Sequence, residues 1–146
     1  MASFRFSLEK VLRWRSIQVA TEEAKLKKLL QEQLQLQKIR AEIGAEEARL
    51  ASSLGTLQGL SGADLRAAHS YSLLLRKQAE KLLRHLSKVE QELTTQKAAY
   101  RQAKQRCRLL EELRSRKLAE WTYEQARELD ALVSESYLAN WGREHI

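Results

Sequence analysis

The chain has 146 residues and a net charge of +7, because 26 Lys and Arg stand against 19 Asp and Glu. Hydrophobic residues make up 43%, yet there is no proline and there are only five glycines, three of them clustered at Gly55, Gly59 and Gly62. Since average proteins carry roughly 5% Pro and about 7% Gly, this composition excludes a many-turned sheet or barrel and argues against disorder, so we expect an all-α protein.

The first predicted helix covers residues 7–58. Ser7 is suited to capping it, and Glu9 lies favourably in its first turn. Beyond that start, nothing but Gly44 interrupts a helical pattern as far as the glycine cluster. Its apolar residues recur at steps of seven in two rows, Leu12, Val19 and Leu26 in one, and Leu29, Leu36, Ile43, Leu50 and Leu57 in the other.

A turn is predicted at residues 55–62, followed by a second helix over 63–140 and a short tail, 141–146. Ser61 and Asp64 have the spacing of a helix-capping pair, and Gly142 is the expected stop signal. Apolar residues again recur at steps of seven. One row is Ala79, Leu86, Leu93, Tyr100 and Cys107; the other is Leu75, Leu82 and Val89, continued after Gln96 by Ala103 and Leu110.

Heptad rows in two long helices joined by one short turn predict an antiparallel coiled-coil hairpin, forming a single domain over residues 1–146. In this register, the numbers of facing residues add up to about 120. The second helix is then longer than the first, and its residues from about 113 to 140 extend beyond the start of the first helix by roughly 40 Å, forming an overhang. Apolar side chains on the overhang predict a partner-binding surface, since an uncovered apolar patch usually marks an interaction site. They are Leu118, Trp121, Leu129, Leu132 and Tyr137.

Charge is unevenly distributed along the hairpin. Residues 1–28 hold seven basic and three acidic residues, and residues 101–118 hold seven basic and two acidic ones. These two segments lie side by side in the predicted hairpin, which makes its open end strongly positive. Residues 119–146 are acidic instead, with two basic and six acidic residues. A basic end of this kind fits nucleic acid, an anionic membrane surface or an acidic protein.

No motif of catalysis or metal binding is found in the sequence. It has no glycine-rich phosphate loop, no paired cysteines and no His/Cys cluster at zinc spacing. The single cysteine, Cys107, falls on the helix seam and fits a reducing compartment. A two-helix rod also lacks the concave pocket of an active site. We therefore expect no enzymatic activity, no cofactor and no metal.

The N-terminus shows neither an apolar signal sequence nor a membrane-spanning segment. Charged residues Arg5, Glu9 and Lys10 occupy the place of a signal peptide's apolar region. The longest run of large aliphatic residues, Leu73–Leu75, is far shorter than the ~20 residues that cross a bilayer. A cytoplasmic protein is expected.

Both ends of the chain resemble the flagellar FliJ family. The opening Phe4-Arg-Phe-Ser-Leu8-Glu-Lys-Val11-Leu12-Arg13-Trp-Arg15 is similar to that family's aromatic-x-aromatic, Leu, Val-Leu, Arg entry into a long helix. The stretch Glu124-Gln-Ala-Arg-Glu-Leu-Asp130 looks like its closing Glu-rich segment with Leu-Asp. Ala131 departs from the family, which usually has an acid there, and the aromatic tail at residues 137–142 has no counterpart that we can place.

The resemblance implies a stalk-like, non-catalytic component of the type III flagellar export apparatus. In that family, the end bearing the termini inserts in the hexameric export ATPase, and the hairpin half faces the membrane export gate. Family members are also described as escorting export chaperones, and they associate peripherally with the inner face of the membrane. The implied gate-facing patch lies within residues 37–50 and 69–83. The implied ATPase contacts are Leu8, Val11, Leu12, Arg13, Arg15, Leu118, Trp121, Leu129 and Leu132.

Two other functions fit the same physical features. A basic helical hairpin that binds nucleic acid needs stacking aromatics along its basic faces, whereas the aromatics here cluster at the ends. A coiled-coil adaptor, generic or from a virulence-type secretion system, shares every feature except the two end motifs.

Overall fold

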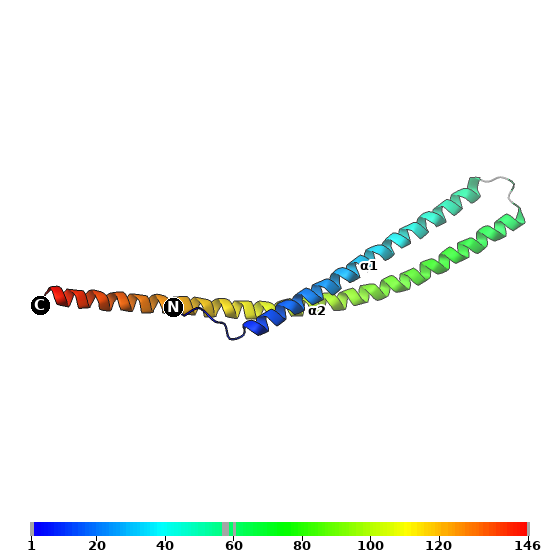
Figure 1. The fold of residues 1–146 in the computed structure, drawn as a ribbon. Helices are drawn as coiled ribbons and strands as arrows, with labels where there is room; N and C mark the ends of the chain where they lie inside the picture. The colour runs from blue at the N-terminus through cyan, green and yellow to red at the C-terminus, as the bar shows by residue number, and fades with distance from the viewer. Residues whose placement is uncertain (1, 57–58, 60, 146) are drawn as a thin grey trace. The chain divides into compact units, whose positions relative to one another are not determined.

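The computed structural model describes residues 2–56, 59 and 61–145. They form two helices, α1 over Glu9–Thr56 (48 residues) and α2 over Gly62–Glu144 (83 residues). The two helices pack against each other in opposite directions, and the described residues contain no strand (Figure 1). The predicted all-α hairpin of two long helices is confirmed.

Contacts divide the chain into two compact units, and both helices contribute to each. The hairpin unit is Thr21–Arg101, which includes the connection between the helices. The terminal unit is Met1–Ala20 together with Gln102–Ile146.

The core of the hairpin unit is the predicted heptad seam. Its buried residues come from both helices, and Val89 is the most buried, with 1% of its surface exposed. Full burial of such a side chain contributes about 1.5–3 kcal/mol, so the seam rather than helix propensity stabilises this unit. The core consists of Leu36, Leu82, Leu86, Val89 and Leu93, with Leu26, Leu29 and Ile43 packed against it.

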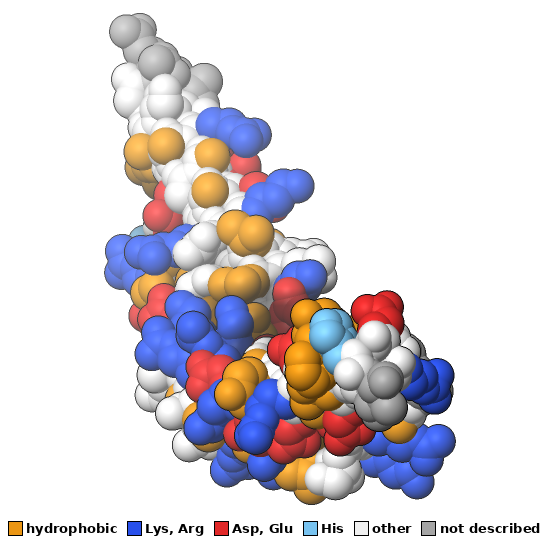
Figure 2. Space-filling model, turned by 90° about the vertical axis from the view of Figure 1, so that its left-hand side faces the viewer, with side chains coloured by type: hydrophobic (Ala, Val, Ile, Leu, Met, Phe, Trp, Pro, Cys, Tyr) orange, Lys and Arg blue, Asp and Glu red, His pale blue; other side chains and the backbone are white. Residues whose placement is uncertain are grey.

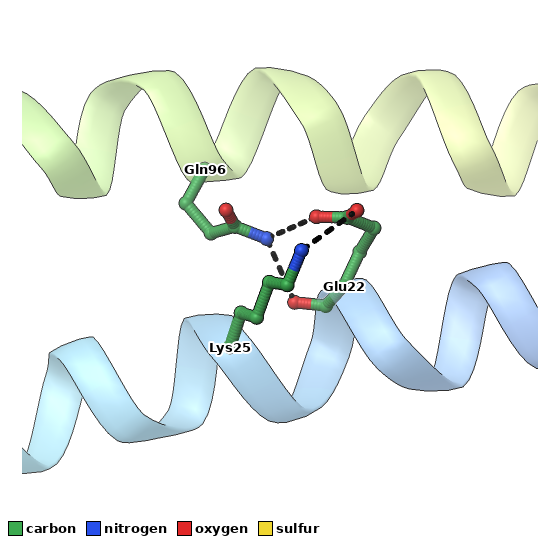
Figure 3. A network of polar contacts seen from close by, with 3 residues as sticks. All are labelled: Glu22, Lys25 and Gln96. Carbon is green, nitrogen blue, oxygen red and sulfur yellow. Dashed lines mark hydrogen bonds and ion pairs between the residues drawn. The ribbon is translucent and has the colours of Figure 1, made fainter.

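A polar layer interrupts this seam at Gln96, which occupies a heptad position between Val89 and Ala103. Its side-chain amide donates hydrogen bonds to the backbone carbonyl of Glu22, at 3.0 Å, and to the Glu22 carboxylate (Figure 3). Lys25 lies 3.7 Å from the same carboxylate. The amide can reach these partners in one alignment of the helices only, so the layer favours the observed register over a slipped one.

Pairs across the two helices confirm the predicted register within each unit. In the hairpin unit, Glu32 lies 3.2 Å from His85, and Glu46 accepts a hydrogen bond from Tyr71, so the facing numbers add up to 117. In the terminal unit, Glu9 pairs with Arg114 at 3.0 Å, which gives 123. Both values lie within three of the expected 120.

The start of α1 differs from the prediction. The helix begins at Glu9, and the carbonyl of Leu8, not of Ser7, accepts its first helical hydrogen bond, from the Leu12 amide at 2.9 Å. A turn precedes it, because the Glu9 amide bonds to the Phe6 carbonyl at 3.2 Å. Ser7 therefore belongs to that turn and is not the cap.

At the other turn, the predicted cap of α2 is confirmed. The Asp64 amide donates to the Ser61 hydroxyl at 3.1 Å, and the Ser61 amide donates to the Asp64 carboxylate at 3.2 Å. This reciprocal pair satisfies two of the free amides at the helix start. Within the connection, Gly59 has a φ of 82°, a conformation that glycine adopts without strain. The predicted end of the first helix at residue 58 lies outside the described residues.

The predicted stop of the second helix near residue 140 is wrong. Gly142 lies inside α2, which continues to Glu144 and leaves no separate tail from residue 141. The His145 amide donates to the Trp141 carbonyl at 3.1 Å, and the two rings stack with centroids 4.6 Å apart. This contact extends the last turn past the glycine, whose own conformation is helical.

Candidate interaction surfaces of the terminal unit

The N-terminal arm, residues 2–7, lies along α2 before α1 begins. The Phe4 ring packs against Trp121 with centroids 6.0 Å apart and planes tilted by 56°. The guanidinium of Arg114 lies 5.6 Å from the centre of the Phe4 ring and also pairs with Glu9. One arginine thus links the arm, the start of α1 and α2.

The arm changes where the overhang begins. From helix lengths alone, α2 was expected to lose its cover at about residue 113. The arm instead follows α2 past Trp121 to the groove that Ala2 lines with Leu129, because an extended segment advances about 3.3 Å per residue whereas a helix advances 1.5 Å. Six non-helical residues therefore cover more of α2 than six helical residues would.

Two shallow grooves lie between the arm and α2. Leu8 lines the first with Phe4, Leu113 and Trp121. Trp121, Leu129 and Leu132 line the second, beside Ala2. Four predicted contact residues, Leu8, Trp121, Leu129 and Leu132, are thus brought to two adjoining grooves.

Three of the apolar residues predicted for the overhang, Leu118, Leu129 and Leu132, are exposed as expected. The exposed fractions are 59% for Leu129 and 63% for Leu132, and Leu118 is also exposed. Figure 2 shows hydrophobic side chains gathered at the C-terminal end of α2. Further along α2, more than half of the surface is open for Val133, Tyr137, Leu138 and Trp141. The apolar surface is wider than the predicted stripe.

The predicted contact residues of α1 face different directions. Val11 and Arg13 are exposed, whereas Leu12 is half-buried. Arg15 is also half-buried, with its guanidinium 4.7 Å from the centre of the Trp14 ring. Leu12 therefore lies at the edge of the seam between the helices, as its heptad row predicts.

Sequence reasoning missed three residues of this region. Trp14 and Ile17 are exposed large apolar residues of α1. Phe4 was identified as part of an end motif but not as a packing partner of Trp121. The signal for Trp14 and Ile17 was their position outside the heptad rows, since a large apolar residue off the seam has no place in a two-helix core.

The charges of α2 reverse sign within the terminal unit. Its basic segment, residues 102–118, has six basic and two acidic residues, a net charge of +4. Its acidic segment, residues 119–144, has two basic and six acidic residues, a net charge of −4. Basic and acidic side chains are both seen beside the apolar end in Figure 2.

The hairpin unit has its own groove between the helix ends near the connection. It is lined by Leu50 and Leu54 of α1 and by Leu65 and His69 of α2. Nearby, the Tyr71 hydroxyl donates to the Glu46 carboxylate at 3.0 Å, and this hydrogen bond raises the pKa of Tyr71. The groove touches the edges of the two ranges, 37–50 and 69–83, that the family resemblance implies for the gate.

The acidic, histidine and cysteine side chains of the described residues bear on the metal-binding prediction. No three His, Cys, Asp or Glu side chains within residues 2–56, 59 and 61–145 are grouped to hold a metal ion. Cys107 is buried, with the Ser16 hydroxyl 3.6 Å from its sulfur, which agrees with its predicted place on the seam. What the arrangement offers chemically is a set of apolar and charged docking surfaces.

No protein-family model, curated protein or solved structure matches the chain. Among the described residues, neither helix has a stretch long and apolar enough to cross a membrane. The two observations that bear on function are therefore the end motifs of the sequence and the exposed surfaces of the terminal unit.

Proposed function

We propose that this chain is a non-catalytic coiled-coil stalk of the flagellar type III protein export apparatus. Its terminal unit docks in the export ATPase ring, and its hairpin unit meets the membrane export gate. The observation that carries the proposal is the exposed apolar surface at Leu118, Leu129 and Leu132, next to the contact between Phe4 of the opening motif and Trp121, which lies three residues before the closing motif.

The physical support lies in how the two ends of the chain meet. The aromatic opening and the Glu-rich closing segment are more than 100 residues apart in sequence, yet Phe4 packs three residues before Glu124 on α2. Two end motifs that converge on one surface are the pattern expected of a binding site. An exposed apolar surface of this extent also favours a protein partner over solvent.

The ATPase end is tested by measuring stimulation of the purified ATPase by the full chain. Leu129→Ser with Leu132→Ser should abolish most stimulation while leaving the helix content unchanged, since both side chains are already largely exposed. Arg13→Glu with Arg15→Glu should also weaken the stimulation of the ATPase, because the proposal places these two arginines against an acidic lining of the ring. The matched control is Arg84→Glu with Lys88→Glu, two exposed positions of the hairpin unit outside the implied gate-facing ranges.

An unchanged ATPase rate and unchanged export with both variant pairs would refute the assignment. Loss of stimulation by the control pair alone would place the ATPase contact on the hairpin unit and contradict the proposed orientation. Pull-down of export-apparatus components with the same variants separates loss of binding from loss of stimulation.

A further inference from the structure

The outer side of α2 in the hairpin unit carries a row of exposed basic side chains. They follow each other at steps of four and three residues, which keeps them on one side of the helix. The buried seam residues Leu75, Leu82 and Val89 occupy the opposite side. The members of this basic row, all exposed, are Lys77, Lys81, Arg84 and Lys88.

The charge of the basic row is not neutralised within the hairpin unit. None of its members forms an ion pair within the part of the chain that the structure describes, whereas Lys25, Lys27 and Arg49 of α1 each pair with a glutamate. Residues 65–89 of α2 hold six basic residues and one acidic residue, Glu80. Like charges three or four residues apart destabilise a helix, so the row is suited to a negatively charged surface that relieves this repulsion.

Two leucines continue the basic row toward the start of α2. Leu73 and Leu74 precede Lys77 by four and three residues, so they share its side of the helix. They are 42% and 50% exposed and do not belong to the buried core. From Leu73 to Lys88 the face is about 22 Å long. A helix face with exposed apolar and basic side chains is typical of a helix that lies flat on a membrane.

We infer that this face of α2 binds the surface of a phospholipid bilayer that contains anionic headgroups. The ammonium and guanidinium groups of the basic row contact the negative charges of the headgroups. Leu73 and Leu74 enter the boundary between headgroups and acyl chains. The helix seam stays closed in this contact, because the face is already exposed on the folded hairpin.

A bilayer fits this face better than a nucleic acid does. Exposed leucines gain nothing beside a phosphate backbone, whereas a bilayer removes them from water. Proteins that bind single strands stack aromatic rings on the bases, but residues 73–88 contain no Phe, Tyr or Trp. The inference goes beyond the proposed export function, in which the hairpin unit meets a protein gate, and it concerns the purified chain alone.

The test is co-sedimentation of the full chain with lipid vesicles. It should bind vesicles of equal parts phosphatidylcholine and phosphatidylserine, less tightly as salt is added, and bind pure phosphatidylcholine far more weakly. Lys77→Gln with Lys81→Gln should weaken binding roughly 30-fold, because each basic side chain near an anionic surface strengthens binding about fivefold. The matched control is Lys28→Gln with Lys38→Gln, two exposed lysines of α1 in the same unit, which should bind nearly as well as the original chain.

Leu73→Ser with Leu74→Ser separates a bilayer from a nucleic acid. This pair should weaken binding to the anionic vesicles at least tenfold, because both leucines leave water there. Circular dichroism checks that each variant keeps its helix content.

A chain that does not bind the anionic vesicles overturns the inference, and so does an equal loss of binding with the control pair. Tighter binding to a DNA duplex than to the vesicles, with both unaffected by the leucine substitutions, would assign the face to nucleic acid and overturn it too. Because no ATPase or export component is present, each of these results leaves the export proposal to its own test.

Discussion

Leu86 and Leu83 offer a direct test of which face of α2 forms the core. They lie three residues apart in the hairpin unit, and both are leucines in the interior of the same helix. Leu86 is 5% exposed and belongs to the buried core, whereas Leu83 is 46% exposed. Replacing each by Ala removes the same atoms in the same secondary structure, so the difference between them measures burial alone.

The magnitudes follow from the exposed fractions. Leu→Ala deletes three carbon groups, worth about 2.4 kcal/mol when fully buried at ~0.8 kcal/mol each. Leu86→Ala loses nearly all of this and leaves a partial cavity, for a total destabilisation of about 3 kcal/mol. Leu83→Ala loses about half of the transfer term and leaves no enclosed cavity, for about 1 kcal/mol.

Urea unfolding followed by circular dichroism is the assay. With a slope of about 2 kcal/mol per M, the midpoint should fall by roughly 1.5 M for Leu86→Ala and by about 0.5 M for Leu83→Ala. The two variants are compared only if their unfolding free energies have the same slope against urea concentration, because an equal slope shows that both expose the same surface on unfolding. Equal midpoints for the two variants, or a larger loss for Leu83→Ala, would refute the assignment of the heptad seam.

Further predictions concern backbone and titration in the hairpin unit. Gly44→Ala should raise the free energy of unfolding by about 1 kcal/mol, because Gly44 is helical with open space at its Cβ position. Gly59→Ala should lower the free energy of unfolding by about 1 kcal/mol, because Gly59 has a φ of 82°. Urea unfolding of both variants checks the opposite signs, and two equal shifts would contradict them. The pKa of Tyr71 should lie above its ordinary value of about 10, because its neutral hydroxyl donates to Glu46, and Glu46→Gln should lower it. NMR titration of the tyrosine rings, with Tyr71→Phe for assignment, measures this. Since the pKa of Tyr71 is raised in the folded state, the stabilisation from this contact is present below pH ~10 and is lost as pH rises through the folded pKa. A Tyr71 pKa that Glu46→Gln leaves unchanged would count against this hydrogen bond as the cause of the shift.

The candidate surfaces were predictable where they depend on helix periodicity. Leu129 and Leu132 were expected to be exposed because no residue of the first helix remained to cover them, and they are. Leu12 was expected on the same surface because it lies in a family-like motif, but the heptad pattern had already placed it on the seam. The half-buried state of Leu12 agrees with the heptad pattern, since burial follows from which side of the helix a residue occupies.

The sequence by itself determined the helices, their antiparallel pairing and the register, because heptad spacing and a single glycine-rich turn leave few ways to bury the apolar rows. Only the tertiary structure decided how the ends are built. The packing of Phe4 on Trp121, held by Arg114, and the extension of α2 past Gly142 depend on contacts between non-helical residues and side chains that no periodic pattern encodes. An extended arm has no repeat in its sequence, so its path along α2 is fixed by the aromatic and charged groups that it meets there.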